Sequence, residues 1–275
     1  MMRNALVVSA LILLGLGLDL TLFPGKTATF FSWPIAPNLS AGTFGAFYFT
    51  ALAALIIAMR GWVWARIRPV LPGGIVFSAL LFLATMIHLG KFNFDAPGTA
   101  AKIVAWVWTI AYAILPPVLL IAVLGPQRHE PGTDPPRERL VPWFRAAVVT
   151  LGAVMIAVGV ALWVAPEQVA KVWPGALTAL TGRVLGSWAI GLGLVYAVSG
   201  LDDRRQSVEP AAGALALMGV FQLLTLARFN GDVSWGEAGA WLYVAFLVAS
   251  LAVGAYGLAQ TAAAARTPAR APVPA

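Results

Sequence analysis

The side chains best suited to chemistry in this sequence belong to a short polar motif that occurs twice. The motif reads Lys-Phe-Asn-Phe-Asp at positions 91–95 and Arg-Phe-Asn-Gly-Asp at positions 228–232. Asn and Asp offer oxygen atoms that accept hydrogen bonds, and the first residue of each copy offers a positive charge. The polar residues of the two copies are Lys91, Asn93, Asp95, Arg228, Asn230 and Asp232. We interpret these six as candidate ligand-binding residues.

This motif has two interpretations. Each copy follows a long apolar run, and its base and acid are four residues apart, so they could pair on one helix face if the helix continued. In the first interpretation the charges only mark a helix end, where long side chains reach water. In the second, each copy lines a polar pocket that contacts a ligand. Anchoring a helix end at the membrane surface needs only the Lys or Arg. The repeated Asn and Asp are therefore more than such anchoring requires.

An acid and imidazole group in the first half of the chain forms a second candidate site. His88 precedes Lys91 by three residues, and Asp19 lies near the end of the first apolar run. A histidine beside a carboxylate can exchange a proton near neutral pH, and an ionisable group within a membrane suggests function. Asp19, His88 and Asp95 are therefore the candidate catalytic residues. The alternative is a histidine that is only hydrogen-bonded at the interface.

Composition and missing motifs exclude several other classes of site. The absence of cysteine excludes disulfides, thiolate nucleophiles and cysteine–metal sites. The histidines are His88 and His129, too few for a histidine-rich metal site, so we expect neither a metal nor another cofactor. The sequence contains no phosphate-binding loop, zinc-protease helix, serine-hydrolase elbow or dinucleotide fingerprint.

The elements that position these residues are embedded in an apolar chain. Of the 275 residues, 60% are hydrophobic and 11% are charged, whereas soluble domains are about one quarter charged. The net charge of +7 comes from basic residues between apolar runs. This pattern favours contact with lipid headgroups over nucleic-acid binding. We therefore expect the lipid bilayer as a partner and no nucleic acid.

Eight apolar runs predict eight transmembrane helices. Most approach the roughly 20 residues that a helix needs to cross about 30 Å of hydrocarbon. They do not alternate apolar with polar residues, as strands of a membrane barrel would. The runs are Ala5–Phe23, Thr43–Met59, Gly74–Leu89, Ala101–Leu124, Ala146–Ala165, Val184–Ser199, Ala211–Ala227 and Ala238–Gln260. The expected fold class is an all-α integral membrane protein.

Three sequence features recur in the same order and predict an internal duplication. Trp33-Pro34 matches Trp173-Pro174 at an offset of 140 residues, and the polar motif recurs at an offset of 137. Trp106-Val107-Trp108 then matches Trp241-Leu242-Tyr243 at an offset of 135. Because four helices per copy is an even number, both copies would insert in the same direction, as two parallel four-helix repeats.

The duplication divides the chain into four parts. We expect the first four-helix repeat at residues 1–124 and the second at residues 146–260. Residues 125–145 are polar and rich in proline, which predicts a cytoplasmic linker. Residues 261–275 are rich in Ala, Pro and Arg, which predicts a disordered cytoplasmic tail.

Both Trp-Pro segments connect the first two helices of a repeat. Trp33 and Trp173 are also candidate ligand contacts, because a segment of this kind could re-enter the bundle as a lid over a cavity. The alternative is an interfacial segment, since indole rings favour the headgroup level and proline ends a helix. Small residues follow at helical spacing, namely Gly42, Ala46, Gly182 and Gly186. Their spacing predicts close packing of helix backbones.

The basic residues predict the orientation of the helices. With the N-terminus inside, the twelve inner residues are Arg3, Arg60, Arg66, Arg68, Arg128, Arg137, Arg139, Arg145, Arg204, Arg205, Arg266 and Arg270. The six outer ones are Lys26, Lys91, Lys102, Lys171, Arg183 and Arg228. Basic residues concentrate on the cytoplasmic side of membrane proteins. We therefore expect both termini in the cytoplasm and a location in the plasma, or inner, membrane.

The sequence leaves three functions open. The first is a carrier or binding protein for a small or lipidic molecule, with polar sites near the outer face. The second is a membrane-embedded enzyme that acts on a lipidic substrate through Asp19, His88 and Asp95. The third is a non-catalytic assembly partner of another membrane protein, which needs no site at all.

Overall fold

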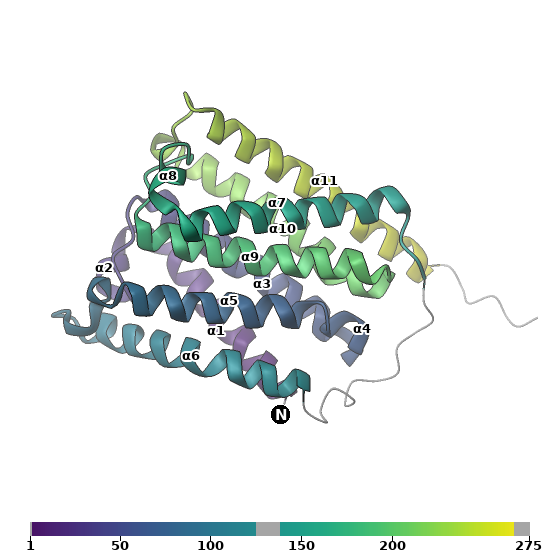
Figure 1. The fold of residues 1–275 in the computed structure, drawn as a ribbon, viewed down its shortest axis with the longest axis horizontal. Coiled ribbons are helices and arrows are strands. Elements are labelled where there is room, and N and C mark those ends of the chain that lie inside the picture. Colours follow the sequence, from purple (N-terminus) through teal and green to yellow (C-terminus); the bar gives the residue numbers. More distant parts are fainter. Residues whose placement is uncertain (1, 125–137, 267–275) are drawn as a thin grey trace, which may run out of the picture.

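A computed structural model describes residues 2–124 and 138–266, and every regular element in those ranges is a helix (Figure 1). Eight of these helices are long and apolar enough to cross a membrane, which confirms the prediction of eight apolar helices of spanning length. They are α1 (Met2–Leu22), α3 (Asn38–Met59), α5 (Val70–Ile87), α6 (Thr99–Leu124), α7 (Pro142–Val164), α9 (Ala179–Asp202), α10 (Arg205–Arg228) and α11 (Ala238–Arg266).

Short helices lie at the two ends of the bundle. We call the end that holds both polar motifs, on the left in Figure 1, the motif end. Its short helices are η1 (Pro24–Lys26), α2 (Thr27–Phe30), η3 (Leu89–Lys91), η4 (Asn93–Asp95), α8 (Pro166–Ala170) and η6 (Asn230–Asp232). We call the opposite end, where α9 turns into α10, the linker end. Its short helices are η2 (Arg60–Trp62) and α4 (Trp64–Ile67).

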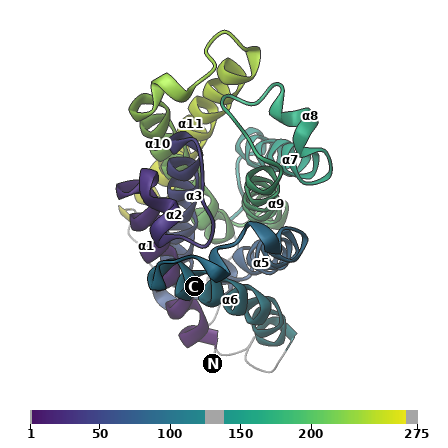
Figure 2. The same ribbon diagram turned by 90° about the vertical axis from the view of Figure 1, so that its left-hand side faces the viewer.

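The eight long helices form two layers (Figure 2). In one layer α1 packs on α3, α3 on α10, and α10 on α11. In the other layer α6 packs on α5, α5 on α9, and α9 on α7. Each layer therefore contains two helices from each half of the chain. The main hydrophobic core also draws residues from both halves, so neither half is a separate bundle.

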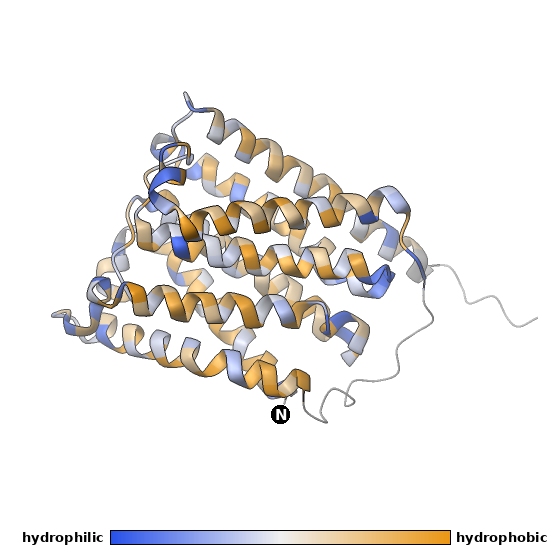
Figure 3. Cartoon of the chain, viewed as in Figure 1, coloured by the Kyte–Doolittle hydropathy of each residue, from blue (hydrophilic) through white to orange (hydrophobic). Residues whose placement is uncertain are grey.

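Apolar side chains cover the outside of the bundle as well as its inside. In α9 and α10, 78% and 67% of the most apolar window is buried, but in α1 the figure is 17% and in α6 and α11 it is 22%. Hydrophilic residues gather at the two ends, with hydrophobic residues between them (Figure 3). A helix that is apolar on both its inner and its outer face is typical of a protein surrounded by lipid.

The observed helix ends correct several expected boundaries. Helix α7 begins at Pro142, not Ala146, because proline is favoured at the first helical position. It therefore includes the last residues of the expected 125–145 linker, of which 125–137 lie outside the described residues. Helix α11 continues to Arg266, six residues into the expected disordered tail. Four consecutive alanines, the best helix formers, lie in this last part.

Glycines allow α7 and α9 to pack backbone against backbone. A Cβ atom at Gly159 would lie 2.8 Å from the carbonyl oxygen of Gly186, and one at Gly152 would lie 2.7 Å from that of Gly193. Both pairs face each other across two antiparallel helices and are seven residues apart along each. Such contacts between small residues are the usual way for helices to associate in lipid.

The small residues identified in the sequence occupy several such interfaces. Gly42 of α3 lies against Thr225 and Phe229 of α10, and Ala46 is buried in the same helix. Gly186 of α9 faces Gly159 as described above. A Cβ atom at Gly182 would lie 2.9 Å from the side chain of Pro166 at the start of α8. All four positions are therefore places of close packing.

Substitution Gly159→Ala tests the importance of the α7–α9 contact. The added methyl group would overlap the Gly186 carbonyl, so we expect a loss of about 1–3 kcal/mol in the free energy of unfolding. Thermal unfolding of the detergent-solubilised protein measures this change. Gly15→Ala in α1 is the matched control, because a Cβ atom there has no neighbour within 4 Å. Equal stability of the two variants would contradict the close packing.

Candidate functional site

In its second copy, the polar motif binds the ends of two helices from the first half. Arg228 donates a hydrogen bond from Nη1 to the carbonyl oxygen of Thr21 at 2.5 Å, near the C-terminus of α1. Asp232 accepts one from the backbone N–H of Leu39 at 3.3 Å, near the N-terminus of α3. A positive charge at a helix C-terminus and a negative charge at an N-terminus both stabilise the helix. Asn230 is exposed.

The first copy of the motif binds the segment that follows α1. Asn93 donates a hydrogen bond from Nδ2 to the carbonyl oxygen of Phe31 at 2.8 Å. Its backbone N–H donates another to the carbonyl oxygen of Ser32 at 2.8 Å. Lys91 and Asp95 are exposed, and among the described residues neither is part of an ion pair. Helix α5 ends at Ile87, so the helical face that would have joined this pair does not exist.

The candidate catalytic residues have different surroundings. Asp19 is half-buried in α1, and Asp95 is exposed. His88 has its Nε2 atom 2.7 Å from Nη1 of Arg183 in α9. Across the described residues, no hydrogen bond or ion pair joins any two of Asp19, His88 and Asp95. The structure therefore does not connect the three as a catalytic group.

His88 is held as a neutral imidazole. Burial lowers its pKa below the usual value, and the positive charges of Arg183 and Lys91 lower it further. Because Arg183 is always protonated, its guanidinium donates the hydrogen bond and Nε2 accepts it. The proton of the neutral ring is therefore on Nδ1.

Trp33 lies in the core at the motif end. It is 2% exposed, and its ring centroid lies 4.9 Å from that of Phe31, 5.1 Å from that of Trp108 and 5.2 Å from that of Phe92. The interpretation of an interfacial anchor is therefore wrong for Trp33. Its indole packs inside the protein because three other aromatic rings surround it there.

At Trp173, the residue matched to Trp33, the structure has a cavity instead of a filled core. The volume is about 370 Å³, and the walls come from both layers in the second half of the chain, with Phe47 of α3 as the one lining residue from the first half. Lining residues include Val158 of α7, Ala189 of α9, Met218 of α10, Tyr243 and Phe246 of α11, and Trp173. The nearest aromatic ring to Trp173 is that of Tyr243, with centroids 6.0 Å apart.

A residue in the cavity wall has a polar atom without a partner. The hydroxyl of Tyr243 is buried, and no described residue accepts or donates a hydrogen bond to it. Trp108, the residue matched to Tyr243, donates from Nε1 to the hydroxyl of Thr85 at 3.1 Å. The residue matched to Thr85 is Gln222, whose Oε1 atom is likewise buried and unpartnered. A buried polar group without a partner costs about 1–3 kcal/mol. Because Nε1 of Trp33 in the filled core is also without a partner, the Tyr243 hydroxyl indicates a ligand only together with the adjoining volume.

One side of the cavity is open. Val154 and Val158 of α7 and Leu242 of α11 line it, and all three are also exposed on the outside of the bundle, with Leu242 71% exposed. Helices α7 and α11 belong to different layers and touch each other only sparsely (Figure 2). The opening therefore lies between α7 and α11 and faces sideways, toward the space that lipid would occupy.

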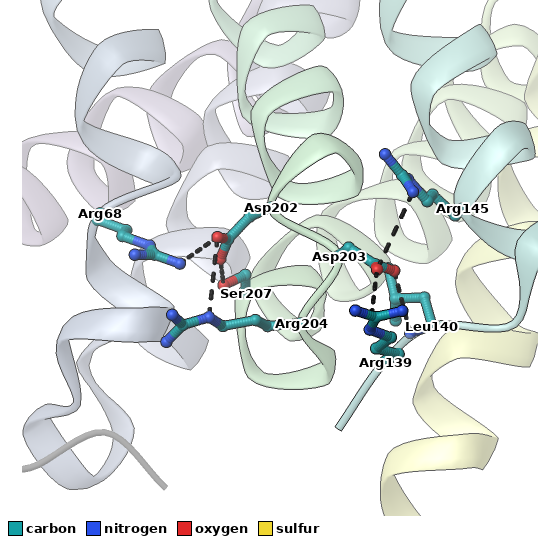
Figure 4. A network of polar contacts seen from close by, with 8 residues as sticks. All are labelled: Arg68, Arg139, Leu140, Arg145, Asp202, Asp203, Arg204 and Ser207. Atoms are coloured by element: carbon teal, nitrogen blue, oxygen red, sulfur yellow. Dashed lines mark hydrogen bonds and ion pairs between the residues drawn. The ribbon is translucent and has the colours of Figure 1, made fainter. Parts of the chain in front are cut away.

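The linker end contains an ionic network that the sequence did not predict. Asp202 contacts Arg68, Ser207 and Arg204, and Asp203 lies 4.0 Å from both Arg139 and Arg145 (Figure 4). Glu209, inside α10, pairs with Nε of Arg66 at 2.5 Å. Helix α10 begins at Arg205, ahead of its apolar run, and the charges in its first turns are neutralised because Arg205 pairs with Glu138 and Glu209 with Arg66.

No family model matches the chain, and no curated protein or solved structure is similar to it. Within the described residues there is no group of three or more His, Asp or Glu side chains that could hold a metal ion. A second apolar pocket, of about 120 Å³, lies between α1, α3, α5, α6 and α9, and the cavity at Trp173 is the roomier of the two.

The cavity could have been found from the sequence by comparing the matched halves more closely. At the offset of 140, Phe31 matches Lys171 and Phe44 matches Val184. Phe31 and Phe44 both touch Trp33 in the filled core. Their replacement by a charged and a smaller side chain predicts that the second half cannot fill the same volume with aromatic rings.

Substitution Asp202→Asn tests the linker-end network. It removes a charge from a pair whose two side chains are largely buried, so Arg68 loses its partner. We expect a loss of about 1–3 kcal/mol in the free energy of unfolding, measured by thermal unfolding in detergent. For Asp203→Asn we expect less than about 1 kcal/mol, because its arginine partners are exposed. A larger effect of Asp203→Asn would show that the network is assigned wrongly.

Proposed function

We propose that this chain is a multi-pass membrane protein that binds a small lipidic molecule in the cavity between α7, α9, α10 and α11. The main support is the combination of an apolar volume of about 370 Å³ with one buried, unpartnered hydroxyl at Tyr243. Small-molecule sites have volumes of about 300–1,000 Å³, mostly apolar walls and few polar groups. This cavity fits that description.

The chemistry of the cavity defines its ligand. Charged groups are absent from the lining, so a charged ligand would be buried without a partner at a high free-energy cost. An aliphatic or isoprenoid chain matches the walls of Val, Leu, Met and Phe side chains. One hydroxyl or carbonyl oxygen on that chain would pair with Tyr243. The ligand class is therefore an apolar molecule with a single uncharged oxygen function, taken up sideways from the lipid between α7 and α11.

The same proposal includes the membrane topology and the repeat. Both termini lie in the cytoplasm of a plasma or inner membrane, because the loops that the sequence predicts to be inside hold twelve of the 18 basic residues. Residues 1–124 and 146–260 are two copies of one unit. The helix contacts support this, since α1–α3 corresponds to α7–α9, α5–α6 to α10–α11, and α3–α10 to α9–α5.

The alternative functions have less support. An enzyme that uses Asp19, His88 and Asp95 requires a contact among them, and His88 instead bonds to Arg183. A carrier requires a path between the two faces, whereas the cavity is lined, apart from Phe47, by the second half of the chain and opens sideways. A pure assembly partner has no need of a cavity with a buried hydroxyl.

Photolabelling with a long-chain alcohol that bears a diazirine tests the proposed site. After irradiation of the protein in lipid nanodiscs, we expect label on peptides that contain Val158, Trp173 or Tyr243. Ala189→Trp should lower this labelling about ten-fold, because the indole fills the apolar volume. Val158→Trp at the open side should act similarly and is the second variant if Ala189→Trp fails to fold. The matched control is Ala245→Trp, on the exposed side of α11.

The role of the hydroxyl is tested by Tyr243→Phe. Loss of one hydrogen bond should lower the labelling by the alcohol about five-fold and leave the labelling by an alkane diazirine unchanged. Tyr256→Phe, at the other end of α11, should change neither. Uniform label over all exposed helices, unaffected by Ala189→Trp, would contradict the cavity as a binding site.

Single cysteines test the topology, since the chain has none of its own. Gly98 and Asn230 are exposed at the motif end, and Gln260 is exposed near the linker end. In intact cells we expect an impermeant maleimide to label Gly98→Cys and Asn230→Cys from outside. Gln260→Cys should react only after the membrane is opened. The reverse pattern would invert the orientation but would leave the cavity proposal intact.

A further inference from the structure

Three basic or imidazole side chains come together at the motif end, on a different face of α9 from the cavity. Arg183 of α9 reaches His88 at the end of α5, with 2.7 Å between Nη1 and Nε2. Lys91 follows one turn after His88, and its backbone N–H donates to the His88 carbonyl oxygen at 2.8 Å. The charges of both Arg183 and Lys91 act on His88. The group joins two elements that are 95 residues apart in sequence.

No acid balances this group. Among the described residues neither Arg183 nor Lys91 forms an ion pair, although Asp95 is only four residues from Lys91. By contrast, Arg66, Arg68 and Arg205 at the linker end all have carboxylate partners. The positive charges of Arg183 and Lys91 both act on His88 and repel each other, although solvent at the exposed Lys91 weakens this repulsion. A bound anion would remove this repulsion.

The donors of the group suit an oxyanion. The guanidinium of Arg183 has five N–H donors, and His88 accepts from Nη1. Arg183 is half-buried, while Lys91 is exposed. Since Arg183 is the fifth residue of α9, it lies about 6 Å along the axis from the start of the helix. In a membrane this is the depth of the lipid headgroups, where a planar guanidinium can bind two oxygens of one phosphate.

We propose that Arg183, His88 and Lys91 form a phosphate-binding site at the motif end. Arg183, held in place by its hydrogen bond to Nε2 of His88, supplies the paired N–H donors, and the Lys91 ammonium supplies a second positive charge. The phosphate belongs either to the headgroup of an anionic phospholipid or to a free phosphate ion. This site does not depend on the cavity or on what the cavity binds.

Native mass spectrometry of the full chain in neutral detergent tests the site. Titration with phosphatidylglycerol gives the dissociation constant, with uncharged diacylglycerol as the comparison lipid. We expect Arg183→Gln to weaken phosphatidylglycerol binding about ten-fold and Lys91→Gln about five-fold. The matched control is Lys102→Gln, which removes one positive charge at the exposed start of α6 and should change nothing.

Competition with millimolar inorganic phosphate at constant ionic strength identifies the source of the anion. Displacement of phosphatidylglycerol means that the site takes free phosphate, and no displacement means that it is specific for the headgroup. Unchanged binding in both Arg183→Gln and Lys91→Gln, or an equal loss in Lys102→Gln, would overturn the proposal. If Arg183→Gln does not fold, Lys91→Gln alone decides, because its side chain is exposed. Photolabelling of the cavity is measured separately and should be the same in all three variants.

Discussion

The packing of α3 on α10 and of α5 on α9 is the interaction on which the rest of this structure depends. It requires small residues, since a Cβ atom at Gly73 of α5 would lie 2.4 Å from the carbonyl oxygen of Gly191 in α9. On the other side of the core, Gln222 of α10 donates a hydrogen bond to the carbonyl oxygen of Thr43 in α3 at 3.1 Å. These two contacts combine the halves into one core and leave α1, α6, α7 and α11 at the periphery.

Charged side chains reinforce the same contact from both ends of the bundle. Arg228 and Asp232 reach α1 and α3 at the motif end, and Asp202 and Glu209 reach arginines of the first half at the linker end. Each of these bonds joins one half of the chain to the other. Polar residues near the helix ends thus connect the halves where water or headgroups can solvate them, and apolar packing joins them between the ends.

Much of the fold could be predicted from the sequence, because spanning helices need long apolar runs. The ends of the helices were less predictable. The first turns of α10 include Glu209, which a hydropathy pattern places in a loop, and its partner Arg66 is 143 residues away. The same limit applies to His88. We expected His88 to lie in a group with Asp19 and Asp95, whereas its partner Arg183 is 95 residues away in sequence.

The cavity was missed for a different reason, namely that the Trp-Pro motif was compared without the residues around it. Trp33 and Trp173 have the same residue type and the same sequence context, yet one is enclosed by aromatic rings and the other borders an empty volume. The difference comes from the residues around them, not from the tryptophans. The Trp-Pro motif therefore identified the right region of the fold. The motif alone did not distinguish the filled core at Trp33 from the cavity at Trp173.

The interleaving of the two layers has a consequence for biosynthesis. When the ribosome has completed α6, helices α3 and α5 still lack α10 and α9, the helices on which they pack. In the membrane-inserted chain proposed above, their glycine-lined faces would remain in contact with lipid until residues 179–228 are in place. The first half alone is thus an incompletely packed intermediate. A chain that stops before α9 would leave those faces available to other membrane proteins.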